Sequence, residues 1–240
     1  MMKPIQILLL IIVTISCTQR IKVPINRMMT PEVIGGGAEI EFQRIGYAQS
    51  RLDFTGGRTD NPLGFTSVVS NRTLYIAAGV SQNVDLFVRI PQESSSLLGL
   101  KVQLIGVPSK TRNNSHQFAF TVAVGSERDS FEGAYEIDLK SDVRDLGLIY
   151  GYRLNHLFIA YTSVSLSSYH FRGDVKDGGG VLIDDKIDYE AQNILGGQMG
   201  FEFGGETFSL KLELAAQKIK WTNTEEELLY SSGLAFKYVF

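Results

Sequence analysis

The sequence contains little cysteine, proline or histidine, and it has no excess of basic residues. Its 240 residues include one Cys, six Pro and three His, and the formal net charge is −3. A single cysteine excludes an intramolecular disulfide. The slightly acidic balance, with no basic stripe carrying interleaved aromatic residues, argues against a nucleic-acid binder. After the N-terminal run, no stretch approaches the ~20 apolar residues that a transmembrane helix requires.

What the sequence does contain favours a folded chain rich in strands. Hydrophobic residues make up 44% and charged residues 20%, so a large apolar surface has to be removed from water. The 24 Gly, 14 Phe and 10 Tyr suit tight turns and closely packed strands better than helices.

Residues 1–16 are predicted to be a signal peptide that exports the protein. The apolar run from Ile5 to Ile15 is too short to span a bilayer as a helix and has the length of a signal-peptide core. The run is followed by Ser16 and Cys17, which resemble a bacterial lipoprotein signal and imply that Cys17 is lipidated. An ordinary signal peptide with a chance cysteine is the alternative. Residues 17–35 show no sustained period and are predicted to be a periplasmic linker.

From residue 36 onward, apolar and polar residues alternate with period two, which indicates strands. In the stretch 84–90, for example, Val84, Leu86, Val88 and Ile90 share one face and Asp85 and Arg89 the other. Ten strands are expected, at about 37–47, 68–80, 84–91, 99–107, 116–126, 134–153, 157–171, 187–203, 206–221 and 228–240.

The alternation fits two environments, because an apolar face can point inward to a core or outward to lipid. Short and long connections largely alternate along the chain, as in outer-membrane barrels. An even number of strands puts both ends of the barrel chain on one side of a membrane. We therefore predict that residues 36–240 form an antiparallel, up-and-down transmembrane β-barrel of about ten strands, within a range of eight to twelve. Both termini are expected to be periplasmic.

The last strand carries a motif that points to the same location. The pattern Ser231-x-Gly233-x-x-Phe236-x-Tyr238-x-Phe240 resembles the C-terminal signal of bacterial outer-membrane β-barrel proteins. This resemblance implies a location in the outer membrane of a Gram-negative cell, contact with its lipid, and recognition by the barrel assembly machinery. The alternating aromatic rings would face lipid near the interface.

If the aliphatic faces meet lipid, the opposite faces line the lumen. The charged residues expected there are Glu39, Glu41, Asp85, Arg89, Lys101, Arg153, Glu202, Lys211, Glu213 and Lys237. Charges inside a narrow barrel have to be paired or hydrated, and Lys237 is expected to reach Glu39 or Glu41 across the closing strands. These residues form either a structural polar core or a narrow, porin-like pore for small solutes.

Evidence for catalysis is weak. Ser168 and His170 share one face of a strand and faintly resemble the Ser–His pairs of outer-membrane hydrolases, but no acid can be assigned to them. The Asp-rich stretch 174–188 matches no EF-hand spacing, and no metal or cofactor is expected. The predicted function is that of a small integral outer-membrane protein with a structural, surface-interaction or minor pore role. A soluble β-barrel lipoprotein that binds an apolar ligand, and a barrel-embedded hydrolase, are the alternatives.

Overall fold

The computed structural model describes residues 18–240 except 54–62, 107–112, 133–134, 178–179 and 223. The predicted signal peptide and Cys17 lie outside the described residues. The described chain is built from strands: β1 Thr18–Pro24, β2 Ala38–Asp53, β3 Leu63–Ser81, β4 Val84–Pro91, β5 Leu97–Ile105, β6 Ser115–Glu132, β7 Tyr135–Asn155, β8 Phe158–Asp177, β9 Leu182–Gly204, β10 Phe208–Trp221 and β11 Glu226–Val239. No helix among the described residues is long and apolar enough to cross a membrane.

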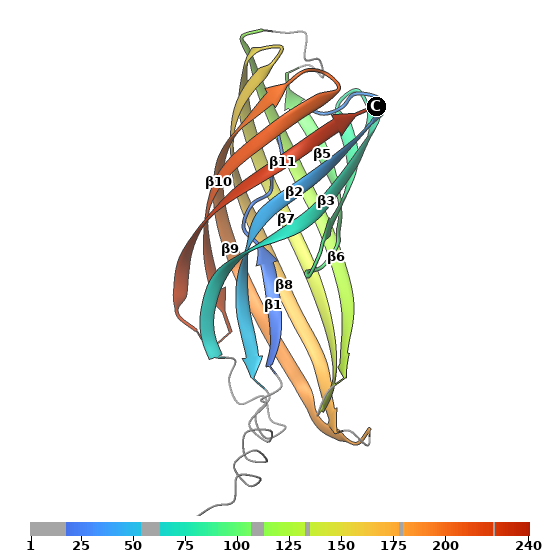
Figure 1. Cartoon of the computed structure of the whole chain (residues 1–240), viewed down its shortest axis with the longest axis vertical. Coiled ribbons are helices and arrows are strands. Elements are labelled where there is room, and N and C mark those ends of the chain that lie inside the picture. The colour runs from blue at the N-terminus through green and yellow to red at the C-terminus, as the bar shows by residue number, and fades with distance from the viewer. Residues whose placement is uncertain (1–17, 54–62, 107–112, 133–134, 178–179, 223) are drawn as a thin grey trace, which may run out of the picture.

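Strands β2 to β11 form a closed antiparallel barrel of ten strands, in which neighbours along the chain pair with one another (Figure 1). The barrel closes because β2 pairs with β11 along one edge and with β3 along the other. At the closure, the Ala38 N–H donates to the Phe240 carbonyl and the Phe240 N–H to the Ala38 carbonyl, both at 3.0 Å. The predicted all-β, ten-stranded, up-and-down barrel is confirmed.

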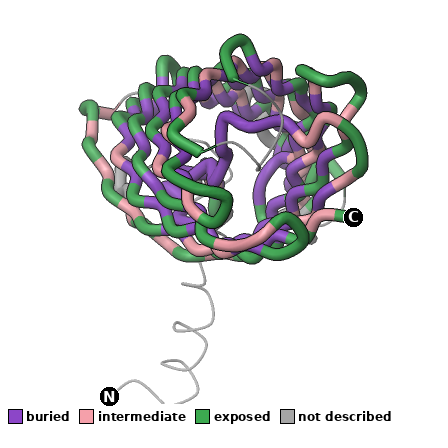
Figure 2. The backbone as a smooth tube through the Cα atoms, turned by 90° about the horizontal axis from the view of Figure 1, so that it is seen from above, coloured by how far each residue is buried: buried purple, intermediate pink, exposed green. Residues whose placement is uncertain are grey.

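The largest difference from the sequence prediction lies in residues 18–34, which were expected to form a linker. Residues 18–24 form β1, which pairs antiparallel with the second half of β2, from Tyr47 to Asp53. This edge of β2 is open to β1 because β11 pairs with β2 only from Leu234 to Val239. Residues 21–34, here called the inner segment, are then buried almost throughout, and Figure 2 shows buried backbone inside the ring of strands.

Because the inner segment runs through the lumen, Thr18 and Phe240 lie at opposite ends of the barrel. Thr18 pairs with Asp53 at one end of β2, whereas Ala38, at the other end of β2, pairs with Phe240. We call these ends of the barrel the Thr18 end and the C-terminal end. The expectation that both termini lie on one side therefore holds for the start of β2 but not for Thr18.

The outer surface of the barrel divides into two zones. Toward the C-terminal end the outward side chains are apolar and exposed, among them Leu86, Leu98, Leu100, Leu104, Leu146, Leu148, Val164, Leu166, Leu195, Met199, Phe201, Leu212, Leu214 and Phe236. Toward the Thr18 end, β6 to β10 continue with polar outward residues, among them Arg128, Lys140, Arg144, Arg172, Asp174, Asp188, Lys218 and Lys220. The apolar zone is here called the apolar band.

The interior shows the reverse distribution. Inside the apolar band the inward residues are mainly polar or charged, whereas inside the polar zone they form an apolar core that includes Tyr169, Phe171, Tyr189 and Trp221. The Tyr189 and Trp221 rings stack with centroids 5.6 Å apart. A barrel in water has an apolar interior, and a barrel in lipid has an apolar exterior. The chain combines both patterns, one above the other along the same strands.

The outward direction of the aliphatic faces contradicts the alternative of a soluble barrel that binds an apolar ligand. That alternative requires the Leu and Phe sets to point into the barrel. Instead Leu214 and Phe240 are 61% and 65% exposed on the outside, while Lys211 and Glu213, on the other face of β10, are 2% exposed.

Candidate functional site

All ten charged residues assigned to the lumen from sequence are buried and face inward. Most of these charges form ion pairs within the barrel, because burying an isolated charge is costly. Lys211 forms a salt bridge with Glu41, and Lys237 forms one with Glu202, with the Glu39 carboxylate 3.9 Å away. Lys101 pairs with Asp85 at 3.2 Å. The predicted contact between Lys237 and Glu39 is present, and Glu202 is an additional partner.

Several of these wall residues bind the inner segment, and Glu213 is the clearest case. Its Oε1 accepts the Arg27 backbone N–H at 2.9 Å, and its Oε2 accepts the Met28 backbone N–H at 2.9 Å. The Asn26 side-chain amide and the Tyr161 hydroxyl donate to the same carboxylate at 3.3 and 3.2 Å. One carboxylate on β10 thus satisfies two backbone donors of a segment that has no strand partner at this point.

The Arg27 side chain connects the inner segment to two further strands. Its guanidinium pairs with Asp145 of β7 and donates to Ser167 of β8 at 2.6 Å. The Arg27 carbonyl accepts from the Arg89 guanidinium of β4 at 2.7 Å. This network crosses the lumen, with both charged partners of the Arg27–Asp145 pair less than a tenth exposed.

A second ion pair lies nearer the C-terminal end. Glu32 of the inner segment pairs with the Arg153 guanidinium of β7, and the Gln117 amide donates to the same carboxylate at 3.2 Å. Beyond it, the Ile34 N–H donates to both carboxylate oxygens of Asp85 at 3.0 and 3.1 Å. The inner segment is therefore hydrogen-bonded to the wall from the middle of the barrel to its C-terminal end.

Glycines in the wall make room for the inner segment. A Cβ at Gly151 would lie 2.7 Å from Pro31 Cγ, and a Cβ at Gly233 would lie 2.8 Å from Met28 Sδ. Real Cβ atoms essentially never approach other atoms so closely, so a side chain at either position would force the inner segment to shift. Two strands far apart in sequence thus carry glycine where the inner segment passes.

The residues of the C-terminal motif divide between the two faces of β11. Gly233 faces inward against the inner segment, as described. Phe236, Tyr238 and Phe240 are exposed on the outside, within the apolar band. Phe236 lies 6.4 Å from the ring of Phe208, and Tyr238 lies 5.7 Å from that of Phe240. Aromatic rings therefore gather on the outer surface at the C-terminal end.

The weak catalytic candidates lie on the outer surface of β8, in the polar zone. His170 is bonded to Asp188 through Nε2, and its Nδ1 lies 3.5 Å from a Glu190 oxygen and accepts from Arg172. No hydrogen bond joins Ser168 to His170 in the described part of the chain. The structure supplies the acid that the sequence could not assign, but both ring nitrogens are engaged, so the base is not directed at Ser168.

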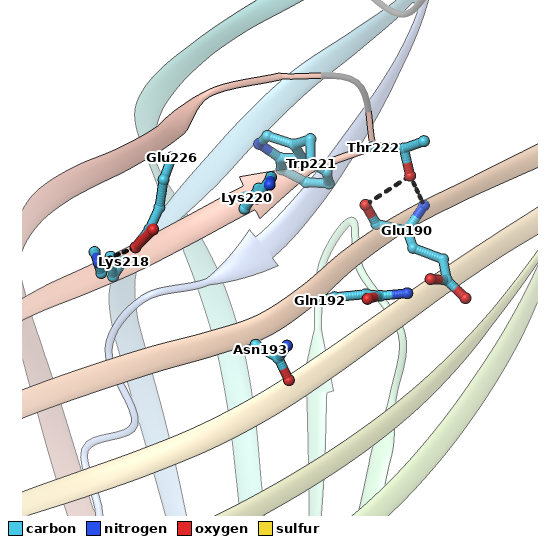
Figure 3. A pocket seen from close by; sticks show the side chains of 8 residues that line it. All are labelled: Glu190, Gln192, Asn193, Lys218, Lys220, Trp221, Thr222 and Glu226. Carbon is cyan, nitrogen blue, oxygen red and sulfur yellow. Dashed lines mark hydrogen bonds and ion pairs between the residues drawn. The ribbon is translucent and has the colours of Figure 1, made fainter.

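A polar groove lies beside this cluster, between β9 and the ends of β10 and β11 (Figure 3). It has a volume of about 440 Å³, and Glu190, Lys218, Lys220 and Glu226 line it. Lys218 pairs with Glu226 across it. Both signs of charge are present, and the groove selects neither an anion nor a cation.

The polar zone also includes the projecting β6–β7 hairpin. Arg128 Nε donates to Asp138 Oδ1 at 2.9 Å on its outer surface. The hydrogen bond from Arg128 lowers the pKa of the Asp138 carboxyl below its usual value. An exposed ion pair of this kind is typical of a surface in contact with water.

No protein-family model matches the chain, and no curated protein matches its sequence. The feature that sequence reasoning missed is the inner segment, whose hydrogen-bonding partners are spread over β2 to β10. The glycines of the wall and its inward-facing acidic residues are a weak sequence signal of this segment. Their presence is best explained when another part of the chain packs against them inside the barrel.

Proposed function

We propose that this protein is a membrane-spanning outer-membrane β-barrel whose lumen is closed by its own N-terminal segment. The proposal is based mainly on a change along single strands, whose outward residues are apolar toward the C-terminal end and polar toward the Thr18 end. On β7, the outward residues from Leu146 to Leu154 are apolar, and those from Asp138 to Arg144 are polar. A stretch of about nine residues matches the ~9–11 that a tilted strand needs to cross a bilayer.

The closed lumen favours a structural or surface role over transport. Residues 23–33 are all buried in the barrel, and they are held by ion pairs and by hydrogen bonds to backbone N–H groups. A porin needs a water-filled passage of the kind that this segment occupies. The barrel then serves as a membrane anchor that presents the polar zone.

The proposed orientation puts the polar zone outside the cell. Outer-membrane barrels project longer connections on the external side and short turns on the periplasmic side. Strands β6 to β10 extend beyond the apolar band at the Thr18 end, which is then external. Thr18 would emerge there, in contrast to the expectation of a periplasmic N-terminus.

The first test of this proposal combines two measurements on the full-length protein. Outer-membrane fractions are run on gels without heating and after heating, since a closed barrel in detergent migrates differently from the unfolded chain. The purified protein is then added to planar bilayers. We expect a heat-dependent mobility shift and no steady conductance. The absence of a shift would contradict the membrane barrel, and steady channel currents would contradict the closed lumen.

A further inference from the structure

Two arginines lie side by side on the outside of the barrel, at the edge of the apolar band. Arg44 of β2 and Arg72 of β3 are directly opposite each other in the strand register, and both are exposed. The Arg44 Nε donates to Ser70 Oγ at 3.1 Å. Among the described residues, neither guanidinium forms a salt bridge with a carboxylate. Like charges directly opposite each other in an antiparallel pair are destabilising, and an anion between them would remove that cost.

The pair lies at a boundary between apolar and polar surface. Toward the C-terminal end, the next outward residues on the same two strands are Phe42 and Leu74, and Phe236 and Ile90 flank them on β11 and β4. Toward the Thr18 end, the next outward position on β3 is Ser70. The β4–β5 turn reaches the same level, because the Gln92 N–H donates to the Arg72 carbonyl at 3.0 Å.

A groove extends across this boundary between the apolar and the polar outer surface. It has a volume of about 600 Å³, and it is lined by both arginines and by the apolar side chains of Phe42, Leu74, Ile90 and Phe236. A ligand that fills it needs a negative group at one end and hydrocarbon at the other. Arginine forks match phosphate oxygens in a bidentate geometry, and an acyl chain suits exposed aliphatic and aromatic side chains.

We propose that this groove binds one anionic lipid that carries a phosphate, with the phosphate between Arg44 and Arg72 and an acyl chain along Phe42 and Phe236. The inference rests on the proposed membrane location, which puts lipid against this surface. The site would hold a lipid from the leaflet nearer the Thr18 end. The charge of the pair selects an anionic headgroup over a zwitterionic one.

The test uses the full-length protein in neutral detergent, incubated with phosphatidylglycerol and phosphatidylcholine of identical acyl chains. Bound lipid is counted by native mass spectrometry. We expect the wild type to prefer phosphatidylglycerol by at least about tenfold, the ratio that corresponds to ~1.4 kcal/mol. The double variant Arg44→Gln/Arg72→Gln is expected to lose that preference. The matched control Lys218→Gln/Lys220→Gln removes the same charge from the polar zone and should keep it.

Three outcomes would overturn the inference. The first is a wild type that shows no preference for phosphatidylglycerol. The second is a lysine control that loses this preference as fully as the arginine variant. The third is competition by glycerol phosphate, which lacks acyl chains, that is as effective as competition by the lipid. Gel mobility with and without heating is measured on the same samples. A normal shift without lipid preference refutes the lipid site alone, whereas a missing shift in the wild type refutes the membrane barrel itself.

Discussion

Replacing Glu213 by leucine tests whether the inner segment is held by the wall or merely lies within it. The substitution removes the acceptor of four hydrogen bonds, two of them from the backbone N–H groups of Arg27 and Met28. Leucine keeps a comparable volume and offers no acceptor. The ion pair between Arg27 and Asp145 is left in place, so the change is confined to the backbone contacts and their neighbours.

The expected effect follows from the cost of leaving buried donors unpaired. Each buried backbone N–H without a partner costs about 1–3 kcal/mol, so two of them cost about 2–6 kcal/mol. The free energy that holds the segment in the lumen falls by this amount. Since ~1.4 kcal/mol corresponds to a tenfold change, the population with the segment displaced rises by at least about 30-fold.

The displaced population can be measured through a cysteine in the inner segment. Thr30 is 3% exposed, so a Thr30→Cys side chain reacts with a bulky maleimide only when the segment leaves its place. Cys17→Ser removes the single natural cysteine. We expect labelling of the Glu213→Leu protein to be faster by at least the factor given above, with the barrel still folded in the heated and unheated gel comparison.

The matched control is Glu39→Leu. Glu39 is also a buried wall carboxylate, but its charged partner is Lys237 of β11 rather than a group of the inner segment. This variant should label at close to the wild-type rate. Equal labelling rates for wild type, Glu213→Leu and Glu39→Leu would refute the view that the wall contacts hold the segment.

Two further substitutions test the same packing from other strands. Gly151→Val places a Cβ 2.7 Å from Pro31 Cγ, so overpacking should destabilise the folded barrel by about 1–3 kcal/mol and lower the temperature of its gel shift. Gly197→Val, where no atom lies within 4 Å of a new Cβ, should leave that temperature unchanged, and the reasoning fails if both variants behave alike. Arg153→Met leaves the Glu32 carboxylate buried without its partner and should cost about 3–5 kcal/mol in thermal unfolding. Arg153→Lys should recover part of this loss, and a methionine variant as stable as the lysine variant would contradict the assigned ion pair.

Strand identity and facing could be predicted from sequence because both depend on local pattern. The division of β4 into Leu86 and Ile90 outside and Asp85 and Arg89 inside needs only a period of two. The change from apolar to polar outward residues along β7 to β10 could also be read from the sequence. Leu146 and Arg144, for example, are successive outward residues of β7, and one is apolar while the other is charged. The interpretation proposed for it, a change of surroundings from lipid to water, needed the strands to be aligned in the barrel.

The sequence by itself determined a barrel of eight to twelve strands with a charged lumen, because alternation, turn spacing and inward charges are set by residues near one another in the chain. Only the tertiary structure decided what fills the lumen. Residues 18–34 have no period, and their partners are remote: 186 positions separate Arg27 from Glu213, and 121 separate Glu32 from Arg153. A segment whose backbone donors are satisfied by distant carboxylates has no local pattern that would predict it, and those carboxylates lie close together only in the closed barrel.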